Sequence, residues 1–228
     1  MFNLDASIQK NNTELKNIDT QMRWIYIHNL ATGIPSKISI SELKRLEAGE
    51  NSEIDIAMIE KPDFMCEQIE SGAKYGTLVH TALQKIDFEK LNIEQIVSGL
   101  TNEKGLYKSI FNKLNTFSKT ELFNEIKSAS KIFKETSFNL NLTAKEVYGI
   151  DSSETIMIQG IIDLYFVDNN GEIVLVDYKT DNVQSRNELI KRYKPQLDYY
   201  KRALEDITGK RVKKTVIYSL KLEQEIEL

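Results

Sequence analysis

The chain has 228 residues, of which 41% are apolar and only three are proline, so it can form one large domain with a sizeable core and is not a disordered tail. No apolar run approaches the roughly 18–20 residues that span a bilayer, and no signal peptide opens the sequence. The single cysteine, Cys66, excludes an internal disulfide and a cysteine-rich metal site, and it suits the reducing cytoplasm. Because the net charge is −4, any contact with nucleic acid must be local or made by another domain.

Residues 1–70 are predicted to be a helical and linker segment. Apolar residues at near-helical spacing predict a helix over 6–31. Ser39 and Glu42 stand three residues apart, as in a capping box, and predict the start of a short helix. Residues 47–70 are acidic and of mixed character, which is typical of a loop.

A second domain is predicted to span 71–228 and to begin with helices. An apolar stripe at helical spacing predicts the first of them. The predicted helices are 72–86, 92–100, 104–116 and 119–134. Together they form a helical N-terminal layer of this domain.

The pattern then changes to the period of two that is typical of strands. Strands are predicted at 138–142, 156–167 and 173–180, with a hairpin turn at Asp168-Asn169-Asn170-Gly171. The strand 173–180 is almost continuously apolar, so we expect it in the centre of a sheet.

A helix and a last strand complete the pattern. Pro195 interrupts the helical stretch after residue 180 and is expected as the first residue of a new helix, which ends at Thr208-Gly209. A strand follows over 212–220. This order predicts an α/β fold, in which helices flank a mixed central sheet.

Two carboxylates and a lysine fall on the predicted hairpin. If its turn contains three residues, Asp163 lies directly opposite Asp177, and a two-residue turn shifts this by one position. Lys179 shares a face with Asp177, because side chains alternate along a strand. Like charges opposite each other destabilise a strand pair, and a divalent cation bound by both aspartates would compensate. The alternative is a simple Asp–Lys ion pair with Asp163 as a capping residue.

Further polar residues lie on helices that are predicted to be amphipathic. His80 lies beside the apolar stripe of its helix, where it is either a metal ligand or a core histidine. Gln196 and Tyr200 are four residues apart on an apolar stripe, so packing alone is an alternative to a functional role. His28 is interpreted as structural.

Basic residues gather late in the chain. They are a candidate phosphate-binding surface, and the alternative is a set of solvated helix faces. The members are Lys191, Arg192, Lys194, Lys201, Arg202, Lys210, Arg211, Lys213 and Lys214.

Four motifs, taken in order, resemble the RecB-type nuclease module of the PD-(D/E)xK class. They are GTLVH at 76–80, QGIID at 159–163, VDYKTD at 176–181 and QLDYY at 196–200. The chain is similar to the C-terminal nuclease domain of the AddA/RexA subunit of bacterial helicase–nucleases, over about residues 38–228. The segment 134–138 resembles a strand of that family that carries a further acidic residue, here Glu135.

This resemblance implies a restriction-endonuclease-like core and three sets of site residues. The metal ligands would be His80, Asp163, Asp177 and the backbone carbonyl of Tyr178. The catalytic residues would be Asp163, Asp177, Lys179, Glu135 and Gln196. The DNA contacts would be Gln196, Tyr200, Lys194 and Lys201.

The activity that the resemblance implies is hydrolysis of DNA phosphodiester bonds with Mg²⁺ or, in its place, Mn²⁺. The domain would degrade single strands fed to it by an attached helicase region, beside a second nuclease subunit, in double-strand-break repair. No G-x-x-x-x-G-K-[ST] motif occurs, so no ATP site is expected here and the chain is interpreted as a C-terminal fragment. The single cysteine cannot hold the iron–sulfur cluster that some family members use.

Two alternative functions remain open. A nuclease fold that has lost its activity would bind DNA or a partner subunit, although such decay usually removes one of Asp163, Asp177 and Lys179. A sequence-specific restriction-type endonuclease has the same fold. Titrating Mg²⁺ or Mn²⁺ against labelled single-stranded DNA separates an active enzyme from a binding module, and defined cut positions indicate the restriction type.

Overall fold

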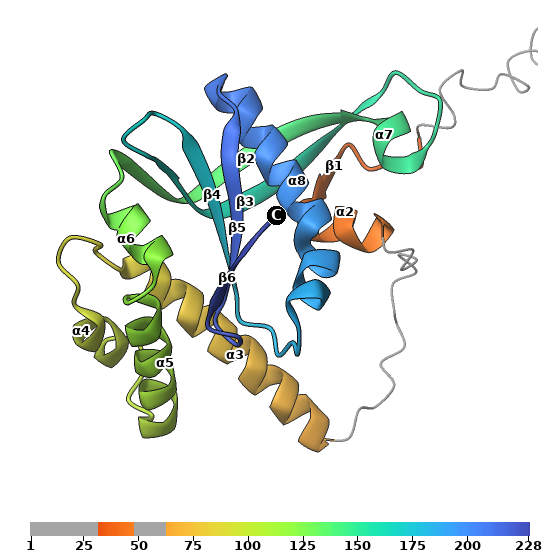
Figure 1. The fold of residues 1–228 in the computed structure, drawn as a ribbon. Helices are drawn as coiled ribbons and strands as arrows, with labels where there is room; N and C mark the ends of the chain where they lie inside the picture. The colour runs from red at the N-terminus through yellow and green to blue at the C-terminus, as the bar shows by residue number, and fades with distance from the viewer. Residues whose placement is uncertain (1–31, 48–62) are drawn as a thin grey trace, which may run out of the picture. The chain divides into compact units, whose positions relative to one another are not determined.

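The computed structural model describes residues 32–47 and 63–228 (Figure 1). The chain divides into two compact units. One comprises Ile38–Leu140 and Met157–Leu228, and the described part of the other comprises 32–37 and 141–156. The helix predicted over 6–31 lies outside the described residues.

A six-stranded mixed sheet forms the centre of the fold, in the order β1-β3-β4-β5-β6, with β2 paired to β3. β4 runs antiparallel to β3 and parallel to β5, and β6 runs antiparallel to β5. The strands are β1 Lys37–Ser39, β2 Lys131–Thr143, β3 Thr155–Val167, β4 Ile173–Lys179, β5 Val212–Ser219 and β6 Gln224–Glu227. The predicted α/β class with a mixed, helix-flanked sheet is therefore confirmed.

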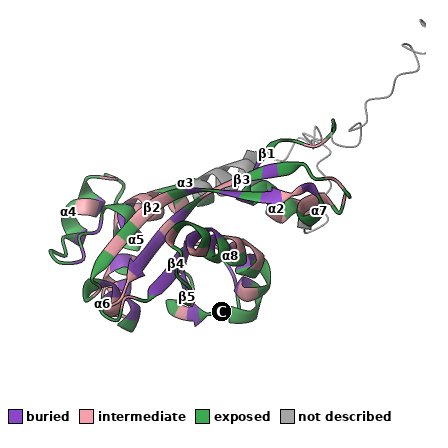
Figure 2. Cartoon of the chain, turned by 90° about the horizontal axis from the view of Figure 1, so that it is seen from above, coloured by how far each residue is buried: buried purple, intermediate pink, exposed green. Residues whose placement is uncertain are grey.

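Strand β4 is central, as its sequence predicted. It lies between β3 and β5, and every residue from Ile173 to Tyr178 is buried (Figure 2). Helices cover both faces of such a strand, so its side chains are apolar on both sides. Asp177 is the exception within this run, and it is only 1% exposed.

Local sequence signals fix several helix ends. Ser39 Oγ accepts a hydrogen bond of 3.1 Å from Glu42 N at the start of α2, as the predicted cap requires. Ser185 caps α8 in the same way, and Gly209 ends α8 in the left-handed conformation that favours glycine. The helices are α2 Ile40–Glu47, α3 Asp63–Lys85, α4 Ile93–Ser98, α5 Lys104–Phe117, α6 Glu121–Lys127, α7 Ala144–Tyr148 and α8 Arg186–Thr208. Within the described residues, no helix is both long and apolar enough to cross a membrane.

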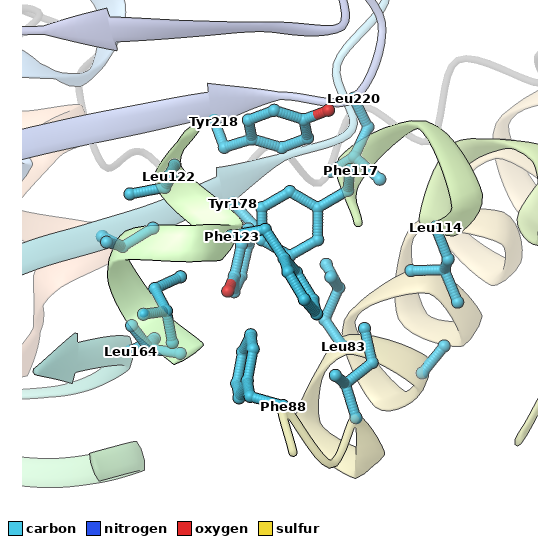
Figure 3. Close-up of a cluster of buried hydrophobic side chains, with 14 of the residues drawn as sticks. Leu83, Phe88, Leu114, Phe117, Leu122, Phe123, Leu164, Tyr178, Tyr218 and Leu220 are labelled. Carbon is cyan, nitrogen blue, oxygen red and sulfur yellow. The ribbon is translucent and has the colours of Figure 1, made fainter. Parts of the chain in front are cut away.

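The apolar core packs α3, α4, α5 and α6 against one face of the sheet. Figure 3 shows Phe117 of α5 beside Tyr178 and Tyr218. The ring centroid of Phe117 lies 5.5 Å from that of Tyr178 and 4.6 Å from that of Tyr218. Because side chains alternate along a strand, the neighbours of Tyr178, which are Asp177 and Lys179, point to the opposite face. Helix α8, which connects β4 to β5, lies on that face.

Two predicted boundaries in the N-terminal half are wrong. Helix α3 begins at Asp63, inside the loop predicted over 47–70, and it continues through Gly72. An interior glycine costs a helix only about 1 kcal/mol, which packing elsewhere on the helix can offset. The helix predicted over 119–134 ends at Lys127, because Ser130 already bonds to the carbonyl of Val167 and begins the pairing of β2 with β3.

The helix break predicted at Pro195 is also wrong, because α8 is one helix with this proline inside it. The buried residues Leu189 and Tyr193 precede the proline, and Leu197 and Tyr200 follow it on the same stripe. Burial of this stripe outweighs the backbone hydrogen bond that proline removes. The sequence analysis did not predict the short elements β1, α7 and β6, although Thr143 and Glu146 form a capping box at the start of α7 and Gly149 ends it.

Candidate active site

Asp163 of β3 and Asp177 of β4 lie opposite each other. The turn is closed by a hydrogen bond of 2.9 Å from Asp168 N to Glu172 O, which leaves three residues in the loop. The register of β3 and β4, continued by one residue, then pairs the two aspartates. The three-residue alternative for the turn is therefore confirmed.

Asp177 forms an ion pair with Lys179. Its Oδ2 lies 2.7 Å from Lys179 Nζ, and the two side chains are 2% and 13% exposed. Because both groups are largely buried, solvent and salt screen this ion pair little. Burial lowers the pKa of Lys179, but Asp177 and Asp163 outweigh burial and raise this pKa, so the ammonium group stays charged.

The surroundings of Asp163 disfavour the ionised form of its carboxyl group. Burial and the neighbouring charge of Asp177 raise the pKa of Asp163 from 3.8 to about 7. Lys179 and a 2.9 Å hydrogen bond from Tyr178 N to Asp163 Oδ2 oppose this rise without cancelling it. Two carboxylates thus face one lysine, and a bound cation would neutralise the excess negative charge.

His80 reaches this pair from α3. Its Nδ1 lies 3.6 Å from Asp163 Oδ2. Burial, followed by the charge of Lys179, lowers the pKa of His80, which favours the neutral imidazole that can bind a metal. Gly76, one turn earlier, explains the close approach of α3, because a Cβ there would stand 3.1 Å from Thr180 Oγ1 at the end of β4.

Glu135 of β2 has an unusual backbone. Its φ of 47° is left-handed, which is unfavourable for a residue other than glycine and is found at bulges and functional sites. Burial raises the pKa of its carboxyl group, and its charge in turn contributes to the raised pKa of Asp163. Glu135 therefore adds a third acid near the aspartate pair.

Gln196 and Tyr200 of α8 contact each other over the same face. Gln196 Nε2 donates a hydrogen bond of 2.7 Å to Tyr200 OH, so the amide in the apolar stripe has a partner. The ring of Tyr200 packs edge-on against Phe138, at a centroid distance of 5.4 Å. A Cβ on Gly160 would lie 2.6 Å from the Phe138 ring, which explains the glycine that precedes the Ile161-Ile162-Asp163 segment.

Comparison with known proteins agrees with this arrangement. The model of the PD-(D/E)XK nuclease superfamily matches residues 59–226. The chain belongs to this superfamily. PD-(D/E)XK nucleases generally use divalent metal ions, and the aspartates and the lysine described above are residues of the type that gives the superfamily its name.

Two curated relatives of this chain have the same name. The chain is 33% identical to the A subunit of the ATP-dependent helicase/nuclease of Syntrophomonas wolfei, over 94% of this chain and 19% of the relative. It is 31% identical to the protein of the same name in Clostridium acetobutylicum, over 90% of this chain and 18% of the relative. The chain thus spans about a fifth of the length of these relatives. The solved structure of SSO0001 is 13% identical with a TM-score of 0.39, covering 97% of this chain and 78% of that one, and this likeness is too distant to describe the fold.

The donor atoms of this PD-(D/E)XK site suit a hard divalent cation. Within residues 32–47 and 63–228, no group of three His, Cys, Asp or Glu side chains is already arranged to hold a metal ion. Asp177 nevertheless supplies a buried carboxylate and Asp163 a largely buried one, and His80 contacts Asp163. The ligand set of these three side chains with the Tyr178 carbonyl remains a prediction.

The predicted DNA contacts divide into two groups. Gln196 and Tyr200 lie beside the PD-(D/E)XK residues, as described above. Lys194 and Lys201 are exposed, and Lys194 forms an ion pair of 3.2 Å with Asp198 one turn later. Their role in DNA binding also remains a prediction.

Sequence reasoning missed two residues around Lys179, which are Tyr193 and Lys44. Lys179 Nζ lies over the ring of Tyr193, 4.3 Å from its centroid, and Lys44 Nζ of α2 lies 3.9 Å from the same centroid. Tyr193 shares the buried stripe of α8, so its ring could be predicted to face the sheet. No signal in the sequence connects it with Lys44.

Proposed function

We propose that this chain hydrolyses DNA phosphodiester bonds in a reaction that depends on a divalent metal ion. The observation that carries the proposal is the convergence of Asp163, Asp177 and Lys179 in a chain of a nuclease superfamily. A simple ion pair explains Lys179 beside Asp177, but one lysine does not balance the charges of both aspartates. Burying an uncompensated carboxylate is unfavourable, and a cation bound between the aspartates removes the cost.

We assign a separate role in this reaction to each of the side chains. His80, Asp163 and Asp177, with the Tyr178 carbonyl, would hold Mg²⁺, which when bound lowers the pKa of a coordinated water molecule. Lys179 is fixed by its ion pair and is placed to hold a phosphate oxygen or to orient the attacking water. Since its ammonium group is already positioned, little reorganisation is needed as negative charge develops on the phosphate.

Two further residues would act around this centre. Glu135 would contribute a carboxyl group that accepts or relays a proton, because burial favours its protonated form. Gln196 lines the same groove as Lys179 and would contact the DNA strand there. Tyr200 would hold the Gln196 amide in place through their hydrogen bond.

The relatives suggest the wider context. Their name, which describes them as A subunits of an ATP-dependent helicase/nuclease, supports assignment of this chain as the nuclease part of such a protein. It would cut single-stranded DNA delivered by an attached helicase region, with a second nuclease subunit, during double-strand-break repair in the cytoplasm. The boundary between an N-terminal segment, 1–70, and a nuclease domain, 71–228, is part of this proposal.

The test is cleavage of end-labelled single-stranded DNA by the full chain, in EDTA and with Mg²⁺ or Mn²⁺. Cleavage is expected only with metal, and Asp177→Ala should abolish it while the circular dichroism spectrum stays unchanged. Lys179→Ala should retain Mn²⁺ binding and cut on the order of 10²–10³ more slowly. The exposed Lys108→Ala and Asp206→Asn are controls with the same charge changes. Absence of cleavage by the wild-type chain with either metal would refute the proposal.

A further inference from the structure

A groove of about 990 Å³ lies between α2 and α8 and includes Lys179 and Gln196 in its lining. Its walls carry five basic side chains and one acidic side chain, in a chain whose net charge is −4. The basic residues are Lys44 and Arg45 of α2, Lys179 of β4, and Lys191 and Arg192 of α8, and the acidic residue is Glu188. Positive charge is therefore concentrated where the groove meets the active site.

Among the described residues, only two of these five basic side chains, Lys179 and Arg192, have an ion-pair partner. Arg192 pairs with Asp181 at 3.2 Å and, more loosely, with Glu188 at 4.0 Å. Within the part of the chain that the structure describes, Lys44, Arg45 and Lys191 form no ion pair. Solvated lysines on a convex helix face need no partner, but basic groups that line one concave groove repel each other.

Lys44 experiences this repulsion most clearly. Its ammonium group lies over the Tyr193 ring, whose centroid is also 4.3 Å from Lys179 Nζ. Partial burial, then the charges of Lys179 and Arg192, lower the pKa of Lys44. The site at Lys44 thus favours an anion, and it is contiguous through Tyr193 with the lysine that would act on the scissile phosphate.

We propose that this groove binds the phosphodiester backbone of the DNA strand on one side of the scissile phosphate, and that Lys44 holds a phosphate group there. The inference rests on the proposed nuclease function. Two ammonium groups already lie over the ring of Tyr193, so this ring is not available to stack on a base. Contacts of lysine and arginine with phosphate carry no sequence information, so binding along this groove is independent of base sequence.

A DNA strand bound in this groove would follow a different path from a strand bound along the exposed side of α8. Lys194 lies near Lys191 in the sequence, but it pairs with Asp198 and does not line this groove. The groove instead brings the strand between α2 and α8, where Lys44 and Lys191 face the same space. Neutralising a lysine inside the groove should therefore weaken binding more than neutralising Lys194.

The test measures how the affinity of the full chain for fluorescent single-stranded DNA of about 16 nucleotides depends on salt. Titrations in EDTA between about 50 and 200 mM salt give the slope of log affinity against log salt. Each phosphate contact in a single strand contributes about 0.7 to this slope. Lys44→Ala and Lys191→Ala should each weaken binding and reduce the slope by about 0.7, whereas Lys108→Ala, at an exposed position on α5, should leave the slope unchanged.

The variant Lys44→Gln distinguishes two roles for Lys44, which are contact with a phosphate group and support of the Tyr193 ring. It retains a polar side chain that can cover the ring, so a supporting role would leave the salt slope at the wild-type value, and that result would overturn the proposal. If the wild type cleaves DNA and Lys44→Ala keeps the wild-type slope, the groove proposal is wrong and the nuclease function stands. If the wild type neither binds nor cleaves single-stranded DNA, both proposals fail.

Discussion

Replacing Asp163 by asparagine should stabilise the metal-free protein, and the gain should depend on pH. The folded state raises the pKa of Asp163 from 3.8 to about 7, so the folded protein holds a proton there that the unfolded chain has released. Folding is then most favourable below pH 3.8 and loses stability as pH rises through 7. Asparagine resembles the protonated acid and retains an oxygen that can accept the hydrogen bond from Tyr178 N, so it should avoid this loss.

The size of the effect follows from the two pKa values. They differ by about three pH units, and each unit corresponds to about 1.36 kcal/mol, so full ionisation of Asp163 destabilises the folded state by about 4 kcal/mol. The advantage of Asp163→Asn should be small near pH 4, grow by about 1.4 kcal/mol per pH unit and level off above pH 7. A gain of this shape identifies a strained carboxylate, since removal of an ordinary salt bridge would destabilise the protein.

Urea unfolding in EDTA at several pH values between about 5 and 8 measures the free energy of unfolding directly. Asp206→Asn, which removes an exposed carboxylate of α8, is the matched control and should show no growing advantage over this range. Adding Mn²⁺ at pH 8 should reverse the order by stabilising the wild type more than Asp163→Asn. A difference between Asp163→Asn and wild type that stays constant with pH would refute the reasoning.

Further substitutions test the surroundings of the site. His80→Ala should weaken Mn²⁺ binding in calorimetry more than it lowers thermal stability, and unchanged affinity would remove His80 from the ligand set. Gly160→Ala should destabilise the fold by about 1–3 kcal/mol through its clash with Phe138, and Phe138→Leu should relieve part of this loss in a double mutant. Tyr193→Leu should lower the cleavage rate by releasing Lys179, whereas Tyr193→Phe, which keeps the ring, should retain most of the rate.

The hairpin at the centre of the site could be predicted because its determinants are local. Asp168 Oδ1 accepts hydrogen bonds from Asn170 N at 2.8 Å and Glu172 N at 2.9 Å, and Gly171 adopts a φ of 81°. A short acidic side chain and a glycine at these positions fix the turn length. The turn length fixes the register, and the register places Asp163 opposite Asp177.

Other features depend on contacts between distant parts of the chain, which the sequence does not reveal. Glu135 has a left-handed backbone within β2, which pairs with β3, and a glutamate gives no sequence signal for this conformation. The course of α8 through Pro195 depends on burial against the sheet, although the proline itself predicts a break. The approach of Lys44 to Tyr193 joins residues from α2 and α8, and each residue taken alone has an ordinary helical environment.

The three consecutive residues of the Asp177-Tyr178-Lys179 segment show how the fold supports a strained site. Tyr178 points into the aromatic cluster with Phe117, so the core holds β4 in place from behind. The backbone N–H of the same tyrosine stabilises the carboxylate of Asp163 across the strand pair. Because alternate side chains belong to different faces, the core can be optimised for packing while Asp163 and Asp177 keep two carboxylates close together, an unfavourable arrangement that the proposed cation would relieve. Stability and chemistry thus come from opposite faces of one buried strand.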